Sequence, residues 1–401
     1  MRTVFLTNAA WHLTLTVMRS LGRRGVKVIA GDTAICKLKS RYCQRYTCYP
    51  DPRSENFVNA LYNIINEMRS DVLIPMGNAT IIPISMNKKL FEELTSVPIP
   101  DFDKVKTAYD KYESVHSASN IGIPVPETYL VRNEKEMERI SQRIEYPAII
   151  KPRESEGSAE GVMRINTPEE MRDVYKKLSM IYGDVVVQEY IPGGSEQMRM
   201  VNVLYDRNSE PVAIFTARKI REYPITGGIT TFGESTWEPE IAEMGQKLFD
   251  AWKWYGVAEI EFKVDPRDGV PKLIEVNPRF WSYLQLPIYC GVDFPYLLYK
   301  VSLNERVRRV EKYKVGVKYI HPLKDVLSVI GIMRSGRAIH VLRSYKGEKT
   351  YAILALDDPL ATIGKILSDL EGIMRKKGRR KEGNIEGGEM KRCSLRGCRK
   401  K

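Results

Sequence analysis

The chain has 401 residues, of which 43% are hydrophobic and 28% are charged, a composition typical of a globular protein with room for two or three domains. No apolar run reaches the length of a membrane span, and the opening residues have a strand pattern rather than that of a signal peptide. The six cysteines are scattered and form no Cys-x-x-Cys pair, which excludes a disulfide scaffold and disfavours a zinc site. We therefore expect a cytoplasmic protein without a membrane partner.

The net charge of +13 is concentrated at the C-terminal end of the chain. Residues 375–401 hold twelve Lys or Arg and three Glu, so the remainder carries only about +4. We interpret residues 377–401 as a basic, disordered tail. The alternative is a weak contact between this tail and an acidic partner such as nucleic acid.

The first hundred residues alternate strand and helix patterns. Apolar strands at 3–7, 26–32 and 71–77 are separated by helical spacing at 13–21 and 57–68. This order predicts a small parallel βαβ sheet in a domain spanning residues 1–100. The loop after the first strand lacks G-x-G-x-x-G, so a dinucleotide site of the usual kind is not expected.

A lysine next precedes a glycine-rich loop. Residues 99–107 look like a linker that leads into a predicted helix ending at Asn120, and a short strand then ends at Lys151. The loop that follows, ESEGSAEG, contains Gly157 and Gly161, whose flexibility lets backbone N–H groups approach an anion. This segment predicts phosphate binding, and a hairpin turn with a surface lysine is the alternative.

Two further segments contain candidate polar groups. Glu189 and Glu196 lie on either side of a Pro-Gly-Gly turn, where a carboxylate could accept hydrogen bonds from ribose or adenine. Arg218, Lys219 and Arg221 follow on a strand beside a Gly-Gly pair. These side chains suit anion binding, and solvated strands are the alternative in both places.

Residues 257–281 predict two strands joined by the turn DPRDG. A hairpin would bring Glu261 near Glu275 and Asn277, which lie two residues apart and so face the same side. Oxygen ligands on facing strands suit Mg²⁺, which usually accompanies phosphate. Arg279 follows on the same face, where it could hold a phosphate or an acyl phosphate.

The remaining residues predict an amphipathic helix at 290–303 and a mixed region at 304–376. The mixed region includes a helix at 360–374 with apolar residues at core spacing.

Taken in order, the segments from about Val105 to Lys300 resemble the ATP-grasp superfamily, and in particular its carboxylate–amine ligases. These include D-alanine–D-alanine ligase, the carbamoyl phosphate synthetase domains and carboligases related to D-aspartate ligase. The resemblance implies an α/β fold in which two α+β subdomains at 101–303 clasp ATP. A small Rossmann-like βαβ domain precedes them, and an α+β extension follows at 304–376.

The resemblance also implies roles for individual residues. Mg²⁺, or Mn²⁺ in its place, would lie on Glu261, Glu275 and Asn277, and Arg279 and Arg218 would stabilise the reacting acyl phosphate. The nucleotide would be held by residues that share no single segment: Lys111, Lys151, Gly157, Ser158, Gly161, Glu189, Tyr190, Ile191 and Glu196.

Two departures qualify the resemblance. Some dipeptide-forming relatives have an arginine two residues before the first metal carboxylate, where this chain has Glu259. Oxyanion stabilisation would then depend on Arg279 or Arg218. A biotin-carboxylase-like catalytic set is not found, so biotin-dependent carboxylation is not expected.

The implied activity is ATP- and Mg²⁺-dependent ligation of a small-molecule carboxylate to an amine or a thiol through an acyl phosphate. The alternatives are an ATP-grasp kinase, an acyl-CoA-type ligase, and a catalytically silent ATP-binding module whose tail contacts an acidic partner. The sequence names neither substrate, and a homodimer remains open.

Overall fold

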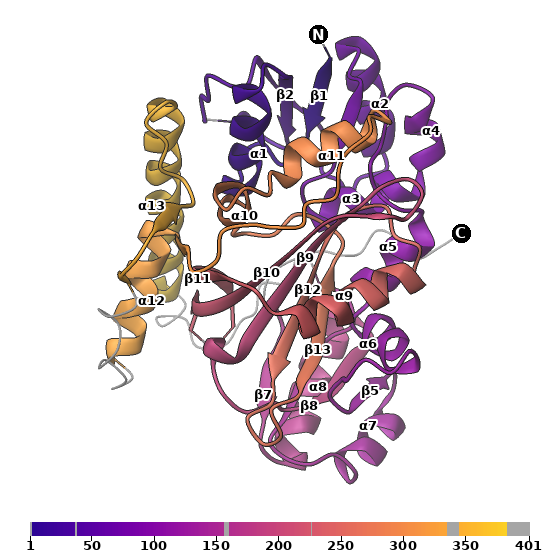
Figure 1. Cartoon of the computed structure of the whole chain (residues 1–401). Helices are drawn as coiled ribbons and strands as arrows, with labels where there is room; N and C mark the ends of the chain where they lie inside the picture. Colours follow the sequence, from indigo (N-terminus) through magenta and orange to yellow (C-terminus); the bar gives the residue numbers. More distant parts are fainter. Residues whose placement is uncertain (1, 37, 156–159, 226, 335–344, 383–401) are drawn as a thin grey trace.

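The computed structural model describes residues 2–36, 38–155, 160–225, 227–334 and 345–382, the last nine of these by their backbone alone. Three β-sheets organise these residues (Figure 1). None of the helices in these ranges combines the length and apolarity that a membrane span requires.

The first sheet is parallel, with strand order β3-β2-β1-β4. It confirms the predicted βαβ series, and β3 is an additional strand that the sequence pattern did not reveal because its residues are mostly polar. The elements of this unit are β1 (Thr3–Leu6), α1 (His12–Arg23), β2 (Lys27–Asp32), β3 (Arg45–Cys48), α2 (Phe57–Met68), β4 (Val72–Ile74), α3 (Asn78–Met86) and α4 (Lys88–Glu92).

Two helices, α5 (Phe102–Tyr109) and α6 (Lys111–Asn120), replace the predicted linker and single helix. The chain is extended at Asp110, whose carboxylate accepts hydrogen bonds from the backbone N–H groups of Tyr112 and Glu113. This N-cap starts a new helix inside a stretch that has continuous helical spacing.

The second sheet is antiparallel, with strand order β5-β8-β6-β7. Helices α7 and α8 complete its own hydrophobic core, whose buried members all come from residues 131–187. The elements are β5 (Thr128–Val131), α7 (Glu134–Ser141), β6 (Ala148–Pro152), β7 (Met163–Ile165), α8 (Pro168–Tyr182) and β8 (Val185–Glu189).

The third sheet is the largest and lies at the centre, with strand order β13-β12-β9-β10-β11-β14-β15. Its first six strands form one antiparallel series, and β14 pairs in parallel with β15. The elements are η1 (Ser195–Gln197), β9 (Met198–Tyr205), β10 (Pro211–Tyr223), β11 (Ile229–Thr236), α9 (Pro239–Ala251), β12 (Gly256–Val264), β13 (Pro271–Asn277), α10 (Gln285–Tyr289), α11 (Phe294–Ser302), β14 (Lys318–Ile320), α12 (Pro322–Arg334), β15 (Lys349–Tyr351) and α13 (Pro359–Glu382).

The C-terminal elements differ from the predicted ones in extent. The helix predicted at 290–303 is shorter and is preceded by the separate helix α10. Helix α13 confirms the helix predicted at 360–374 but continues to Glu382, so the first residues of the predicted tail are helical. The rest of that tail, residues 383–401, lies outside the described residues.

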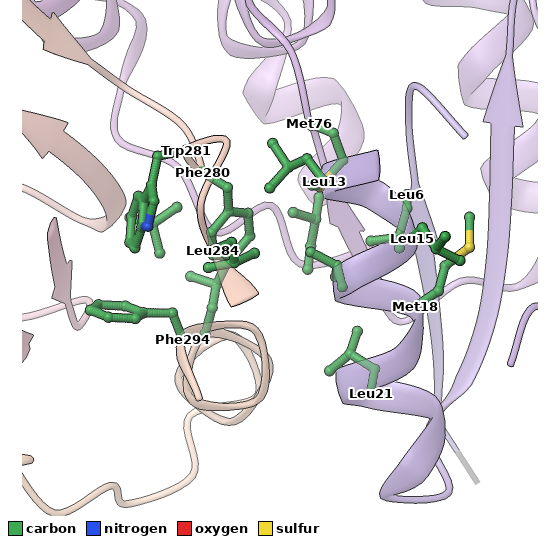
Figure 2. Packing of buried hydrophobic residues seen from close by; sticks show 14 of the residues in the cluster. Leu6, Leu13, Leu15, Met18, Leu21, Met76, Phe280, Trp281, Leu284 and Phe294 are labelled. Atoms are coloured by element: carbon green, nitrogen blue, oxygen red, sulfur yellow. The ribbon is translucent and has the colours of Figure 1, made fainter. Parts of the chain in front are cut away.

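One hydrophobic core joins the parallel sheet to the central sheet. Figure 2 shows Leu13 and Leu21 of α1 on one side of this core, with Phe280, Leu284 and Phe294 on the other. Burial of a large apolar side chain contributes about 1.5–3 kcal/mol. This contact therefore fixes the position of the parallel sheet relative to the segment that follows β13.

Candidate active site

The predicted hairpin is present as β12 and β13, and its register places the acidic residues together. Glu261 lies directly opposite Glu275, and Glu259 lies opposite Asn277. Because side chains two residues apart face the same side of a strand, all four point to one face of the central sheet. Within the described ranges, no three His, Cys, Asp or Glu side chains form a metal site by themselves. Two carboxylates and an amide remain as the candidate ligands.

The carboxylates on this face lack enough positive charge nearby. Burial, aided by Glu275 and Glu222, raises the pKa of Glu261 despite its contact with Lys219. Burial and Glu261 also raise the pKa of Glu259, even though the Tyr283 hydroxyl donates a hydrogen bond to Glu259 at 2.7 Å. Neighbouring carboxylates that repel one another would be stabilised by a divalent cation, so Glu261, Glu275 and Asn277 fit a Mg²⁺ ion.

On β10, the basic side chain that lies beside these carboxylates is Lys219. The resemblance implied Arg218 in this position. The Nζ of Lys219 lies 3.5 Å from Glu261 and 3.3 Å from Glu222. Burial works against its charge, but Glu261, Glu222 and Glu259 outweigh that effect and raise its pKa. Only the strand register, which the sequence does not reveal, distinguishes Lys219 from its basic neighbours.

Arg218 is not brought to the carboxylates, which corrects its predicted place in the site. It precedes Lys219 on β10 and therefore points to the opposite face of the sheet. There its Nε donates to Glu234 on β11 at 2.7 Å. A cavity of about 360 Å³ on that side is lined by Thr216, Trp237 and α9, and it contains none of the predicted site residues.

Arg279 lies where the central sheet meets the parallel sheet. Its guanidinium donates to the Asn277 side chain at 3.0 Å and to Asn78, the first residue of α3, at 2.9 Å. Its charge also lowers the pKa of Glu259, against the larger effect of burial. Arg279 is therefore held beside the acidic face by two amide side chains, one from β13 and one from α3.

Lys151 brings positive charge from the antiparallel sheet. It lies near the end of β6 as a buried residue whose Nζ donates to Gln188 at 2.9 Å. Burial lowers the pKa of Lys151 to about 8, with a further reduction from Lys111, and Glu275 and Glu261 partly offset both. The pKa of Lys151 therefore responds to the carboxylates of the acidic face, although the lysine belongs to a different sheet.

Lys111 is the first residue of α6, and its Nζ donates to the Ser155 hydroxyl at 2.9 Å. Its backbone N–H also donates to the carbonyl of Arg153. The lysine thus lies against the start of the glycine-rich loop. Two predicted loop residues, Gly157 and Ser158, lie outside the described residues.

Gly161 closes the described end of this loop with a left-handed backbone, φ +69°. A Cβ at this position would lie 2.6 Å from Cγ of Pro152. Both facts require glycine at this position. The chain that leaves the loop therefore passes close to the end of β6.

The residues predicted to bind adenine, at the end of β8 and directly after it, already have contacts within the protein. The Glu189 carboxylate pairs with Arg267 and with Lys272 at 3.3 Å, so its side chain is engaged. Lys263 donates to the carbonyl of Ile191 at 2.8 Å, and the Arg164 guanidinium lies 4.5 Å from the centre of the Tyr190 ring.

Glu196 is exposed in the short helix η1. Its carboxylate accepts a hydrogen bond from the Gly194 N–H at 3.0 Å. It is the more accessible carboxylate of the predicted nucleotide pair.

Comparisons with known proteins match the part of the chain that contains these residues. A family model described as the ATP-grasp domain matches residues 108–282. D-aspartate ligase of Enterococcus faecium is 24% identical over 56% of this chain and 58% of that protein. D-alanine–D-alanine ligase of Neisseria meningitidis is 26% identical over 49% of this chain and 68% of that protein. The carbamoyl phosphate synthase large chain of Thermoanaerobacter pseudethanolicus is 29% identical over 54% of this chain and 21% of that protein.

Solved structures with the same fold are more distant in sequence. A biotin carboxylase from Campylobacter jejuni superposes with a TM-score of 0.65 at 17% identity, over 79% of this chain and 74% of that one. N5-carboxyaminoimidazole synthetase from Staphylococcus aureus gives 0.61 at 15% identity, over 78% and 80%. Such identities establish the fold alone.

These matches identify the class of the protein. Residues 108–282, less than half of the chain, match the ATP-grasp domain, and solved structures with the same fold contain ADP, in one case with magnesium. Among its relatives are D-aspartate ligase and D-alanine–D-alanine ligase. The chain spans less than two thirds of the length of D-aspartate ligase and of the carbamoyl phosphate synthase large chain.

Proposed function

We propose that this protein is an ATP- and Mg²⁺-dependent ligase that joins a small-molecule carboxylate to an amine or a thiol. The observation that carries the proposal is the electrostatic interaction of Lys151, in β6 of the antiparallel sheet, with Lys111 of α6 and with Glu261 and Glu275 of the central sheet. Lys151 and Lys111 supply charge for phosphate oxygens, and Glu261 and Glu275 supply ligands for the metal that accompanies them. Relatives named D-aspartate ligase and D-alanine–D-alanine ligase support the same class of reaction.

In the proposed reaction, an oxygen of the substrate carboxylate attacks the γ-phosphorus of ATP and the bond to the ADP oxygen breaks. The amine or thiol then attacks the acyl carbon, phosphate leaves, and the nucleophile loses its proton. Bound Mg²⁺ would neutralise phosphate charge. The side chains mainly position the reactants and compensate their charge, since phosphoryl transfer needs little covalent chemistry from the protein.

We assign stabilisation of the acyl phosphate to Arg279. It is anchored to Asn277 and Asn78, so its guanidinium has a fixed position beside the proposed metal ligands. A fixed cation next to developing negative charge stabilises a transition state more than a mobile one does. Arg218 has no part in this step because it faces away from the carboxylates, and Lys219 is the basic residue of β10 on the reacting face.

We assign the adenine to the backbone of residues 189–191 and the ribose to Glu196. The Glu189 carboxylate is already paired with Lys272, so recognition there falls to main-chain groups. The Glu196 carboxylate is exposed and able to accept hydrogen bonds from ribose hydroxyls.

We also propose domain boundaries at residues 100 and 303. The central sheet extends beyond the second boundary, because it includes β14 and β15.

The proposal is tested by measuring ADP and phosphate release with Mg²⁺-ATP against a panel of amino acids and small carboxylates, each with and without amines or thiols. We expect one carboxylate to stimulate release and one nucleophile to give a condensed product by mass spectrometry. Hydroxylamine should trap the acyl phosphate as a hydroxamate. A stable phosphorylated product without condensation would identify a kinase instead, and ATP binding without stimulated release or hydroxamate would contradict the ligase.

A further inference from the structure

Helix α13 presents an apolar stripe that faces away from the rest of the protein. Leu360, Ile363, Leu367 and Leu370 have between 38% and 69% of their surface exposed. Their spacing of three, four and three residues places them along one side of the helix. This is the spacing of the a and d positions in a coiled coil, and a stripe of this kind is normally covered by another helix.

The opposite side of α13 is attached to the molecule. Ala361 and Lys365 are buried, and Lys365 occupies the heptad position opposite the stripe. At the start of the helix, Asp358 forms a buried ion pair with Arg19 of α1, with an Nε–Oδ2 distance of 2.9 Å. The orientation of α13 is therefore fixed, and the stripe faces outward for that reason.

Helix α12 adds apolar surface at the same edge of the molecule (Figure 1). Val326, Ile330 and Met333 are between 40% and 58% exposed and are spaced by four and three residues. The exposed fractions of these seven side chains together correspond to an area on the order of 700 Å², close to the ~800 Å² that each partner contributes to a standard interface. Apolar surface of this extent is typical of an interaction site.

We propose that this stripe binds the same stripe of a second copy of the chain, in an antiparallel helix pair around a two-fold axis. An isologous contact needs a patch that is complementary to itself, which a row of leucine and isoleucine side chains provides. The narrow a/d stripe suits a facing helix better than a lipid surface, where a helix buries a wider apolar face.

Charge selects the antiparallel direction. Residues 375–381, which begin five positions after the last stripe residue, include six Lys or Arg. A parallel pair would bring these two basic segments together, whereas an antiparallel pair separates them. This proposal concerns assembly and does not depend on the ligase activity.

Sedimentation velocity of the full chain at micromolar concentration in physiological salt tests the proposal. We expect a dimer for the natural sequence and a monomer for the double substitution Leu367→Glu and Leu370→Glu. Burying uncompensated carboxylates between the two stripes should raise the dimer Kd by about a hundredfold or more. Circular dichroism would check that the variant keeps its fold, which we expect because both positions are exposed.

A matched control introduces the same two charges at other exposed apolar positions, Met180→Glu and Ile181→Glu at the end of α8. The control should remain a dimer. A monomeric natural protein, or a dimer that persists when the stripe is substituted, would overturn the proposal. If the natural protein is a monomer that binds phosphatidylglycerol vesicles, and the stripe variant does not bind them, lipid is the partner instead.

Discussion

The two small sheets are attached to the central sheet in different ways. The parallel sheet shares a continuous hydrophobic core with it. The antiparallel sheet closes its own core and reaches the central sheet through polar contacts, such as those of Glu189 with Lys272 and of Lys263 with the carbonyl of Ile191. Apolar cores resist displacement, whereas exposed polar contacts exchange readily with water.

This difference separates the two halves of the proposed site. Arg279 and the metal carboxylates belong to the rigid part, while Lys151 belongs to the part attached by polar contacts. A bound nucleotide would link the two parts by its own charge. We therefore expect that removal of a site charge impairs catalysis strongly, and that removal of a contact between the sheets has little effect on stability.

The largest expected effect comes from Glu275→Gln in the rigid half. Loss of one preorganised charged group typically lowers the rate by about 10²-fold or more. Stimulated ADP release is the measurement, and Glu145→Gln, an exposed residue of the antiparallel unit, is the control. Turnover close to that of the natural protein would exclude Glu275 from the site.

Lys151→Met tests the other half. Loss of a charge-assisted contact of about 1.5–3 kcal/mol should raise the Kd of Mg²⁺-ATP by roughly ten- to a hundredfold, as measured by calorimetry. Because the pKa of Lys151 in the free protein is about 8, affinity in the natural protein should fall as the pH rises through that value and the ammonium loses its proton. The variant should lack this dependence, and exposed Lys177→Met should retain it. Equal profiles in all three proteins would place the phosphates elsewhere.

Glu259→Gln should alter the pH dependence of stability. The pKa of Glu259 is raised, so the folded state holds a proton that the unfolded state releases. Stability therefore falls as the pH rises from about 4.3 to the folded-state pKa, by about 1.4 kcal/mol for each pH unit between those two values. Glutamine resembles the protonated side chain, so the variant should gain stability over the natural protein mainly at the alkaline end. Denaturant unfolding across pH measures this, and parallel profiles for the two proteins would contradict it.

The smallest effect is expected from Arg267→Ala at the junction of the antiparallel and central sheets. Its side chain is partly exposed and its ion pair with Glu189 is screened by water. Its other partner, Asp265, keeps an ion pair with Lys272 at 3.0 Å, so the free energy of unfolding should change by only about 1 kcal/mol. Urea unfolding measures the change. A loss of several kcal/mol would mean that this junction is as firmly held as the core of the parallel sheet.

Local patterns in the sequence predicted the parts of the fold that depend on neighbours in the chain. The βαβ series and the β12–β13 hairpin have clear periodicity and turn residues, and both are present. Asp110 was missed because an N-cap within continuous helical spacing leaves the periodicity unchanged. The pairing of β14 with β11 was also missed, because a strand of three residues has no sequence pattern that identifies its partner strand.

For the candidate site, too, local sequence patterns predicted only the contacts between neighbours in the chain. The facing of Glu261 and Glu275 follows from the hairpin alone, whereas the choice between Arg218 and Lys219 requires the register of β10 in a sheet assembled from distant segments. The engagement of Glu189 by Lys272 joins residues 83 apart in the chain. Such contacts are properties of the assembled fold.

The most direct test of a nucleotide site shared by two sheets is hydrogen exchange of the natural protein with and without Mg²⁺ and a non-hydrolysable ATP analogue. We predict added protection in two separate places, at residues 148–152 and 185–191 in and directly after the antiparallel sheet and at residues 259–277 of the central sheet. The parallel sheet and the helices α12 and α13 should remain unchanged. Protection confined to one of the two sheets, or centred on the parallel sheet, would contradict a nucleotide site built from both.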